Sequence, residues 1–351
     1  KGFKAKMKIS VERNDLLRSM SRAQAIVERR TTIPILSNVL IEARDDSLTL
    51  RATDLDIELL DSVKAVVEKE GAVTVGAHTF YDILRKLPEG SRVMLDLDPL
   101  NQKINVMAER SRFSLTTISV DDFPVMTSSE YDFSFSIKVS ELKRLFEKVK
   151  FAMSMEETRF YLNGVFFHEF NGGEAKLLRT VATDGHRLAM ETVSLDSALE
   201  GTEQQILPRK GVVELLRLLS DEGGDITLTF GQNHIRAKVP EFTFTSKLVD
   251  GKFPDYNRVL PKGGNKSVIG DCQELRQAFA RASILSNEKY PNKADTLNYL
   301  GFTTRKLGDY ENGEKYYLQG LAINPNHNGI NEYLGELYVA TNRHNKALER
   351  L

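Results

Sequence analysis

Apolar residues recur along the chain in two patterns, one with the period of a helix and one with the period of a strand. Spacings of three and four residues put the following on one helical face: Leu142, Leu145, Phe146 and Val149. Strict alternation with polar residues, typical of a strand, is shown by Ile226, Leu228 and Phe230, and later by Phe242 and Phe244. Segments with the strand period outnumber the helical ones, which predicts an α+β fold.

The same order of segments occurs twice, about 130 residues apart. Ala52-Thr53-Asp54 recurs at Ala182-Thr183-Asp184, and Phe123-Pro124 recurs at Phe253-Pro254. Two helical segments recur at similar intervals: "LLRSMSRAQ" (16–24) with "ELKRLFEKV" (141–149), and "ILRKL" (83–87) with "LLRLL" (215–219). These matches predict two homologous domains, residues 7–127 and 133–261, each an antiparallel sheet with two amphipathic helices packed on one face. The start of a third domain is predicted over 266–289, where "ELRQAFARASILSNEK" repeats the pattern of the first helix.

Positive charge is concentrated on the four predicted helices. Their net charges are +2 (residues 14–30), +1 (77–87), +3 (138–150) and +2 (208–219), whereas the whole chain has a net charge of −1. Four helices of one sign indicate a surface that faces a polyanion, because Lys and Arg contact phosphates without regard to sequence. Ordinary solvated helix faces are the alternative.

Composition restricts the remaining possibilities. The 351 residues are 41% hydrophobic and 28% charged, as in ordinary globular proteins, and contain no apolar run of membrane-spanning length. The N-terminal "KGFKAKMKIS" lacks the apolar core of a secretory signal. Cys272 is the only cysteine, which excludes an internal disulfide or a cysteine-based zinc site and suits the cytoplasm. We expect Cys272 to be a small buried residue.

The stretch Asp184-Gly185-His186-Arg187 brings an acid, an imidazole and a guanidinium together. A catalytic site would need a nucleophile and an orienting group nearby, and a metal site would need more ligands. The sequence also has no phosphate-binding loop of the Walker A or GxGxxG type. We therefore predict no catalytic residue, no metal and no cofactor, and interpret the repeated Ala-Thr-Asp as part of a repeated fold.

Seven segments in order closely resemble the bacterial β sliding clamp family, the processivity subunit of DNA polymerase III. They are "TIPILSN" (32–38), "RSRFSL" (110–115), "YLNGVFF" (161–167), "RTVATDGHRLA" (179–189), "PRKGVVELLRLL" (208–219), "FTSKLVDGKFPDY" (244–256) and "QAFARASILSNEK" (277–289). The resemblance implies a non-catalytic protein in which two three-domain copies form a ring around duplex DNA. It also implies loading by a clamp loader and tethering of the polymerase III catalytic subunit and other partners through short hydrophobic peptides.

The resemblance further implies roles for individual residues. The peptide-docking cleft would be lined by Leu162, Thr183, Gly185, His186, Arg187, Leu188, Pro254, Arg258 and Val259. DNA contacts would come from Arg30, Arg209 and Lys210, and also from Arg159 and Tyr161. Phe160 is interpreted as a packing residue, an alternative that also applies to Tyr161. Ile284 and Leu285 resemble positions at the dimer interface of the family.

Beyond Lys289 the chain departs from the clamp pattern and acquires a period of 34 residues. Tyr299-Leu300-Gly301 recurs at Tyr333-Leu334-Gly335, and Pro291 recurs at Pro325. This resembles the tetratricopeptide repeat and predicts an all-α segment over 290–351, with helices near 292–307, 310–323, 328–341 and 344–351. The segment "KGFKAK" precedes the family's usual start at Met7. The join at Lys289-Tyr290 fits a natural fusion, an engineered fusion or a sequence assembled from two genes.

The loss of the third domain has a consequence for the ring. That domain supplies one side of each ring interface and one wall of the cleft in the family, so we expect this chain to form monomers or open chains. The function predicted is a DNA sliding clamp in the cytoplasm. The alternative is a protein-interaction scaffold dominated by the tetratricopeptide segment.

Overall fold

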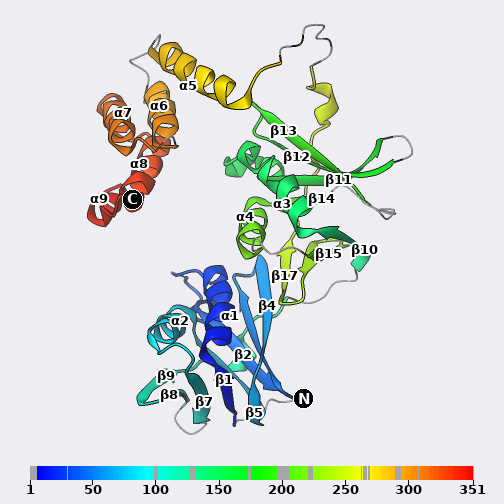
Figure 1. The fold of residues 1–351 in the computed structure, drawn as a ribbon, viewed down its shortest axis with the longest axis vertical. Helices are drawn as coiled ribbons and strands as arrows, with labels where there is room; N and C mark the ends of the chain where they lie inside the picture. Colours follow the sequence, from blue (N-terminus) through cyan, green and yellow to red (C-terminus); the bar gives the residue numbers. More distant parts are fainter. Residues whose placement is uncertain are drawn as a thin grey trace. The chain divides into compact units, whose positions relative to one another are not determined.

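The computed structural model describes residues 6–29, 31–98, 102–126, 131–172, 175–195, 205–219, 224–261, 263, 267, 269–288, 294–306 and 308–350 (Figure 1). The chain divides into two compact units, residues 1–255 and 256–351, here called the N-terminal unit and the C-terminal unit. In the described residues, no helix is long and apolar enough to cross a membrane.

The N-terminal unit contains two repeats of one arrangement of strands and helices. The first repeat comprises β1 (Lys8–Glu12), α1 (Arg13–Ile26), β2 (Asn38–Arg44), β3 (Ser47–Thr53), β4 (Ile57–Lys64), β5 (Val66–Lys69), β6 (Gly71–Gly76), α2 (Ala77–Lys86), β7 (Arg92–Asp98), β8 (Lys103–Ala108) and β9 (Ser111–Thr116). The second comprises β10 (Tyr131–Lys138), α3 (Val139–Glu147), β11 (Gly164–Gly172), β12 (Ala175–Thr183), β13 (Leu188–Ser194), β14 (Gln205–Pro208), α4 (Arg209–Leu218), β15 (Asp225–Gly231), β16 (His234–Lys238) and β17 (Phe242–Lys247). Short 3-10 helices η1–η4 lie at Pro34–Ser37, Val120–Asp122, Lys150–Ala152 and Glu157–Leu162.

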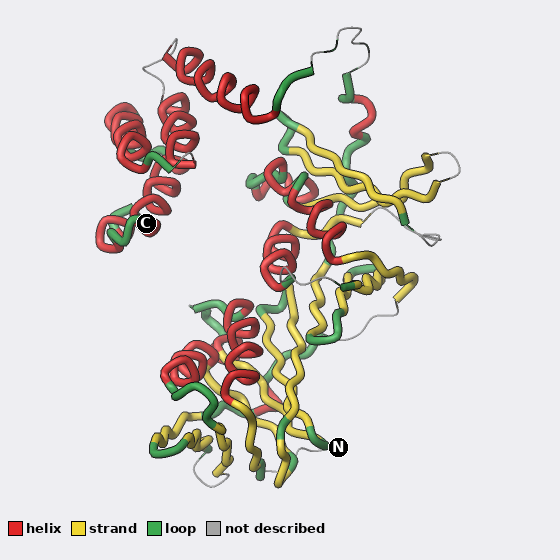
Figure 2. Tube along the Cα trace, in the orientation of Figure 1, coloured by secondary structure: helices red, strands yellow, loops and turns green. Residues whose placement is uncertain are grey.

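The described strands form three antiparallel sheets, one of which spans both repeats. Its order is β10-β15-β16-β17-β4-β3-β2-β6, so that β17 of the second repeat pairs directly with β4 of the first. The other sheets have the orders β5-β1-β7-β8-β9 and β13-β12-β11-β14. Figure 2 shows helices α1 to α4 on the same side of the eight-stranded sheet.

The predicted helical faces are the ones that the structure buries. Leu142, Leu145 and Phe146 of α3 are fully buried, and Leu16 and Met20 occupy the same place on α1. These side chains join the inward-facing strand residues in one core cluster that runs through both repeats. The prediction of antiparallel sheets with two helices packed on them is therefore confirmed.

Polar contacts reinforce the seam between β17 and β4. Lys210 at the start of α4 forms ion pairs with Asp54 and, at 2.9 Å, with Glu28, both in the first repeat. Lys247 pairs with Asp56 at 3.1 Å. The acid lies in the first repeat and the ammonium in the second in every one of these pairs, so the two repeats have complementary charge along the seam.

Gly211 allows α4 to lie close to the seam. A Cβ atom at this position would come within 2.7 Å of Ser246 Oγ on β17 and within 2.8 Å of Leu207 Cδ1 on β14. Gly211 is buried in the first turn of α4. The helix therefore packs against the side chains of β14 and β17 so closely that a larger residue at this position would force those side chains or the helix to move.

The C-terminal unit is helical. Its elements are η5 (Tyr256–Arg258), α5 (Cys272–Glu288), α6 (Ala294–Lys306), α7 (Tyr310–Ile323), α8 (Asn328–Ala340) and α9 (His344–Leu348). Helix α8 begins 34 residues after α6, and α9 begins 34 residues after α7, as the sequence period requires. Tyr317, Ile330 and Leu334 are fully buried at the centre of this unit. The predicted helices are confirmed.

One expectation about this unit is wrong. Cys272 is exposed, not buried, because it is the first residue of α5, where the helix faces solvent along its described side chains. The join at Lys289-Tyr290 lies outside the described residues.

The repeated Ala-Thr-Asp forms the same turn in both repeats. Thr53 Oγ1 donates to the carbonyl of Ile57 at 2.8 Å, and Asp54 Oδ1 accepts from the backbone N–H groups of Asp56 and Ile57. Thr183 and Asp184 make the equivalent bonds around Arg187. The residue after the aspartate has a positive φ in each copy, +81° at Leu55 and +88° at Gly185. The second copy has the residue that this backbone favours, and the first does not.

This difference predicts that Leu55→Gly is more stable than Leu55→Ala by about 1 kcal/mol, because only the alanine keeps the Cβ that opposes a left-handed backbone. Both variants lose the same apolar side chain, so each controls for the other. Chemical denaturation of both proteins measures the difference. A more stable alanine variant would show that the turn is unstrained.

Candidate functional site

The turn at Thr183–Arg187 is closed by its own side chains. Asp184 Oδ1 accepts two hydrogen bonds of 3.0 Å from the N–H groups of His186 and Arg187, and its Oδ2 accepts one of 2.9 Å from Arg187 Nε. Thr183 Oγ1 donates to the Arg187 carbonyl at 2.7 Å and accepts from the N–H of Gly185. The carboxylate is occupied by structural bonds, which explains why an acid stands beside an imidazole in this sequence.

The protonation of Asp184 reflects these contacts. Desolvation raises its pKa, but the hydrogen bonds from His186 and Arg187 and the nearby guanidinium outweigh that effect and lower it below the ordinary value. An aspartate with a lowered pKa is a poor general base at neutral pH. His186 is exposed.

A second segment lies against this turn. The guanidinium of Arg159 in η4 is so close to Gly185 that a Cβ there would approach its Nη1 to 3.0 Å. Arg187 lies over the ring of Phe151, 5.6 Å from its centre. Leu162, at the end of η4, is buried, and its carbonyl accepts a hydrogen bond from the N–H of Ser154. The structure thus brings Arg159 against the turn, although the two are separated in sequence.

Sequence reasoning missed two residues of this surface, Phe151 and Met155. Both are large, apolar and exposed; Phe151, in η3, lies under Arg187 of the turn, and Met155 follows three residues after η3. Phe160 is also exposed, stacked edge-on against Tyr161 at 5.7 Å. The available signal was the apolar stretch "FAMSM" (151–155), which follows the basic helix without continuing its period.

The other residues predicted for the cleft are placed as follows. Leu188 begins β13 and is half-buried, and Pro254 is exposed next to Phe253, whose ring stacks on Phe166 at 4.6 Å. Arg258 and Val259 belong to the C-terminal unit, at the end of η5. Ile284 and Leu285 lie in helix α5, whose side chains are described only as far as residue 280.

The residues predicted to contact DNA have different environments. Arg30 lies outside the described residues. Arg209 and Lys210 are the first two residues of α4, and the N–H of Arg209 donates to the Asn163 carbonyl at 2.9 Å. Burial lowers the pKa of Lys210, but Asp54 and Glu28 raise it by more, so it stays charged and tied to the first repeat. Tyr161 packs against Phe160.

The helix side of the seam is hollowed. A cavity of about 700 Å³ lies between α1, α2 and α4, with Arg18, Arg22 and Arg217 among its lining residues. Each of these guanidiniums also pairs with a carboxylate: Arg18 with Asp15, Arg22 with Asp61, and Arg217 with Glu214. The arginines contributed by both repeats therefore face one recess, together with Glu89 and Glu241.

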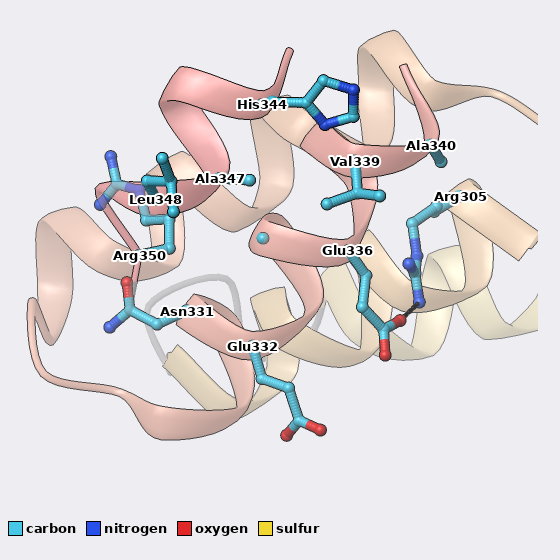
Figure 3. A pocket seen from close by; sticks show the side chains of 11 residues that line it. Arg305, Asn331, Glu332, Glu336, Val339, Ala340, His344, Ala347, Leu348 and Arg350 are labelled. Carbon is cyan, nitrogen blue, oxygen red and sulfur yellow. Dashed lines mark hydrogen bonds and ion pairs between the residues drawn. The ribbon is translucent and has the colours of Figure 1, made fainter. Parts of the chain in front are cut away.

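A separate cavity of about 720 Å³ lies in the C-terminal unit (Figure 3). Its walls come from α6, α8 and α9, with Val339, Ala347 and Leu348 as apolar residues. Arg305 reaches Glu336 at 2.7 Å on one side of it. A group of three or more potential metal ligands does not occur anywhere in the described part of the chain.

Two successive repeats, joined edge to edge by one sheet and carrying basic helices on a common side, define the sliding-clamp fold. Comparison with known proteins gives the family. The family model for "DNA polymerase III beta subunit, N-terminal domain" matches residues 7–127, and that for the "central domain" matches residues 136–255. The chain belongs to the bacterial β sliding clamp family.

Individual relatives agree with this assignment. The beta sliding clamp of Pseudomonas aeruginosa is 47% identical over 285 residues, which cover 81% of this chain and 76% of the relative. That of Escherichia coli K12 is 44% identical with the same coverage. The crystal structure of the DNA polymerase III subunit beta from Pseudomonas aeruginosa is similar with a TM-score of 0.76, 46% identity and coverage of 81% and 76%. A Pseudomonas aeruginosa clamp bound to griselimycin has a TM-score of 0.73, 45% identity and coverage of 81% and 74%.

We expect Asp184→Ala to destabilise the N-terminal unit by about 1 kcal/mol, because two backbone N–H groups lose their acceptor. Asp184→Asn keeps one acceptor oxygen but loses the charge and should have a smaller effect. The folded-state pKa is lowered, so the charge stabilises the fold above the unfolded-state pKa, and this contribution disappears as the pH falls through the folded-state value. Denaturation of the parent and Asp184→Asn should therefore differ at neutral pH and converge in acid. A difference that is independent of pH would contradict this account.

Proposed function

We propose that this chain is a DNA sliding clamp that tethers a polymerase to duplex DNA, with the helices α1 to α4 toward the DNA. The observation that carries this proposal is the common placement of the four helices along two joined repeats. Lys and Arg on such a surface attract phosphates without fixing a sequence, so the protein can move along the duplex. Arg30, Arg209, Lys210, Arg159 and Tyr161 are proposed DNA contacts.

The turn at Thr183–Arg187 is proposed as one wall of a site for partner peptides. An extended peptide with bulky apolar anchors needs an apolar groove and a few polar groups that orient it. Phe151 supplies exposed apolar surface beside Arg187, and Gly185 allows the Arg159 guanidinium to lie against the turn. The site is proposed to comprise Leu162, Thr183, Gly185, His186, Arg187, Leu188, Pro254, Arg258 and Val259. Its partners would be the polymerase III catalytic subunit, the clamp loader and other proteins with such a peptide.

The protein is proposed to be non-catalytic and to act in the cytoplasm with the replication machinery. Domain boundaries at 7–127, 133–261 and 266–289 are part of the proposal, with Ile284 and Leu285 as a remnant of the family's dimer interface. We further propose that residues 290–351 are tetratricopeptide repeats. The matching 34-residue offsets of α6 with α8 and of α7 with α9 support this.

A scaffold function for the C-terminal unit is the second candidate. The cavity between α6, α8 and α9 favours it, because its apolar residues are bordered by charged ones, as in many protein-binding grooves. Partner binding that survives deletion of residues 7–289 would support this candidate over the clamp.

DNA contact through α4 predicts that Arg209→Ala lowers the salt dependence of DNA binding, reducing the slope of log affinity against log salt by about one. Lys69→Ala, on strand β5, is the matched control and should leave the slope unchanged. Binding to a duplex at several salt concentrations measures both. Equal slopes for the two variants would remove α4 from the DNA-facing surface.

Ring closure is tested with nicked circular DNA and its linearised form. After α5 the described part of the chain continues as helices α6 to α9 and not as the sheet of a third clamp domain, so we expect equal loss of the protein from both DNA forms. Retention on circles with loss from linear ends would show that copies of this chain do encircle DNA.

Griselimycin is bound to a related clamp, and we propose that it occupies the peptide site of this chain. We expect Val259→Asp to weaken its binding by about tenfold, because a carboxylate would replace an apolar contact. Val259 is 70% exposed, so the substitution should not disturb folding. Val66→Asp on strand β5 is the control, and calorimetric titration measures the affinities. Unchanged binding to Val259→Asp would exclude this residue from the site.

A further inference from the structure

The pairing of β17 with β4, called the seam, shows how a strand of one repeat pairs with a strand of the other. Strand β17 pairs with β4 in five antiparallel residue pairs, from Phe242 opposite Asp61 to Ser246 opposite Ile57. The N–H of Lys247 donates to the carbonyl of Asp56 at 2.8 Å, which fixes the side of the ladder on which each residue bonds. By alternation, Thr243 bonds with Leu60 and Thr245 with Glu58 across the seam.

Each repeat also has one strand that corresponds to half of this seam but lacks its partner. "FSLTT" (113–117) in β9 corresponds to "FTFTS" (242–246) in β17, and β13 follows the second Ala-Thr-Asp as β4 follows the first. Among the described strands, β9 pairs with β8 alone and β13 with β12 alone. β9 is thus the counterpart of β17, and β13 is the counterpart of β4, but the edge that forms the seam is free in each of them.

Burial distinguishes these free edges from the seam. Phe242, covered by the seam, is 6% exposed, whereas its counterpart Phe113 is 39% exposed. On the other strand, Met190 is 44% exposed. Both edges therefore present apolar surface, which isolated edge strands ordinarily avoid.

The backbone groups on both edges have the orientation that the seam requires. The N–H of Thr117 donates to the carbonyl of Gln102, on the β8 side, at 3.1 Å. The backbone N–H and C=O groups of the alternate residues Ser114 and Thr116 therefore point away from β8, toward the free edge. The N–H of Asp184 donates to the carbonyl of Arg187 within the turn. The backbone N–H and C=O groups of Leu188 and Met190 therefore point away from β12, toward the free edge of β13. These outward residues are the counterparts of Thr243, Thr245, Glu58 and Leu60.

A helix side chain completes the correspondence. At the seam, Arg22 of α1 bonds Asp61 at 2.6 Å and lies over the ring of Phe242. At the free edge, Arg144 of α3 bonds Glu191 at 3.2 Å, in the position where a ring equivalent to Phe242 would arrive.

We propose that β9 of one copy pairs with β13 of a second copy, antiparallel and in the register of the internal seam. Phe113 then lies opposite Glu191 and under Arg144, Ser114 lies opposite Met190, and Thr116 lies opposite Leu188. The contact joins two different surfaces, so copies add head to tail. This contact is made by the first repeat of one copy and the second repeat of the other, without a third domain.

The contact is weaker than the seam within the chain. The ammonium groups of Lys210 and Lys247 cross the seam, but their counterparts on the first repeat are His78 and Ile118. Thr192 limits the ladder, because its carbonyl already accepts from Arg144 and its N–H donates to Glu191. Pairing is therefore reversible and depends on protein concentration.

The register is tested with two double variants of the full chain, without DNA. Ser114→Lys with Met190→Lys places like charges opposite each other and should raise the dissociation constant by about tenfold or more. Ser114→Lys with Met190→Glu places opposite charges there and should restore association to near the parent's level. Sedimentation over a range of concentrations measures all three proteins. Both positions are exposed, and circular dichroism confirms that the variants are folded.

Val66→Lys is the control, because β5 is the other edge of the sheet that contains β9, and it should leave association unchanged. A parent chain that remains monomeric at every concentration overturns the proposal. The proposal is also overturned if Ser114→Lys alone abolishes association and substitutions of Met190 have no effect. That result would indicate that β9 pairs with β9 of the second copy. The experiment contains no DNA, so its failure is distinct from failure of the sliding-clamp function.

Discussion

The backbone ladder between β17 and β4 is the constraint on which the rest of the N-terminal unit depends. Five residue pairs make one sheet from two repeats, and with the sheet fixed, the helices packed on it share one side. Lys210 and Lys247 add ion pairs whose acids lie on the opposite repeat. The recess lined by Arg18, Arg22 and Arg217 exists because this ladder holds α1 and α4 next to each other.

Much of this architecture could be predicted from the sequence, because helices and strands each repeat their apolar residues at a characteristic spacing. The apolar spacing of Leu142, Leu145 and Phe146 required a helix with one buried face, and the alternation around Leu228 required strands. The two copies of Ala-Thr-Asp indicate the repeat through the sequence alone. The pairing of β17 with β4 had no such signal, since contacts between distant strands leave no periodic trace.

The site was predictable in part, for the same reason. The family resemblance pointed to the turn at Thr183–Arg187. It did not predict that Asp184 closes this turn by accepting hydrogen bonds from His186 and Arg187. Phe151 and Met155 were missed because an exposed apolar residue looks like a core residue in a sequence. Lys210 was predicted to contact DNA, and the structure adds that its ammonium holds the two repeats together. The exposure of Cys272 was not foreseen, because a short apolar side chain carries no positional preference strong enough to overrule its place at a helix start.

Gly211 sets the distance between α4 and the strands beneath it. A methyl group at this position would meet Ser246 and Leu207 well inside van der Waals contact, so either these side chains or the helix would have to move. Arg209 and Lys210 precede Gly211 in the first turn of α4 and would shift with any displacement of the helix. The reach of these cations toward a passing phosphate is therefore governed by a hydrogen atom where every other amino acid has carbon.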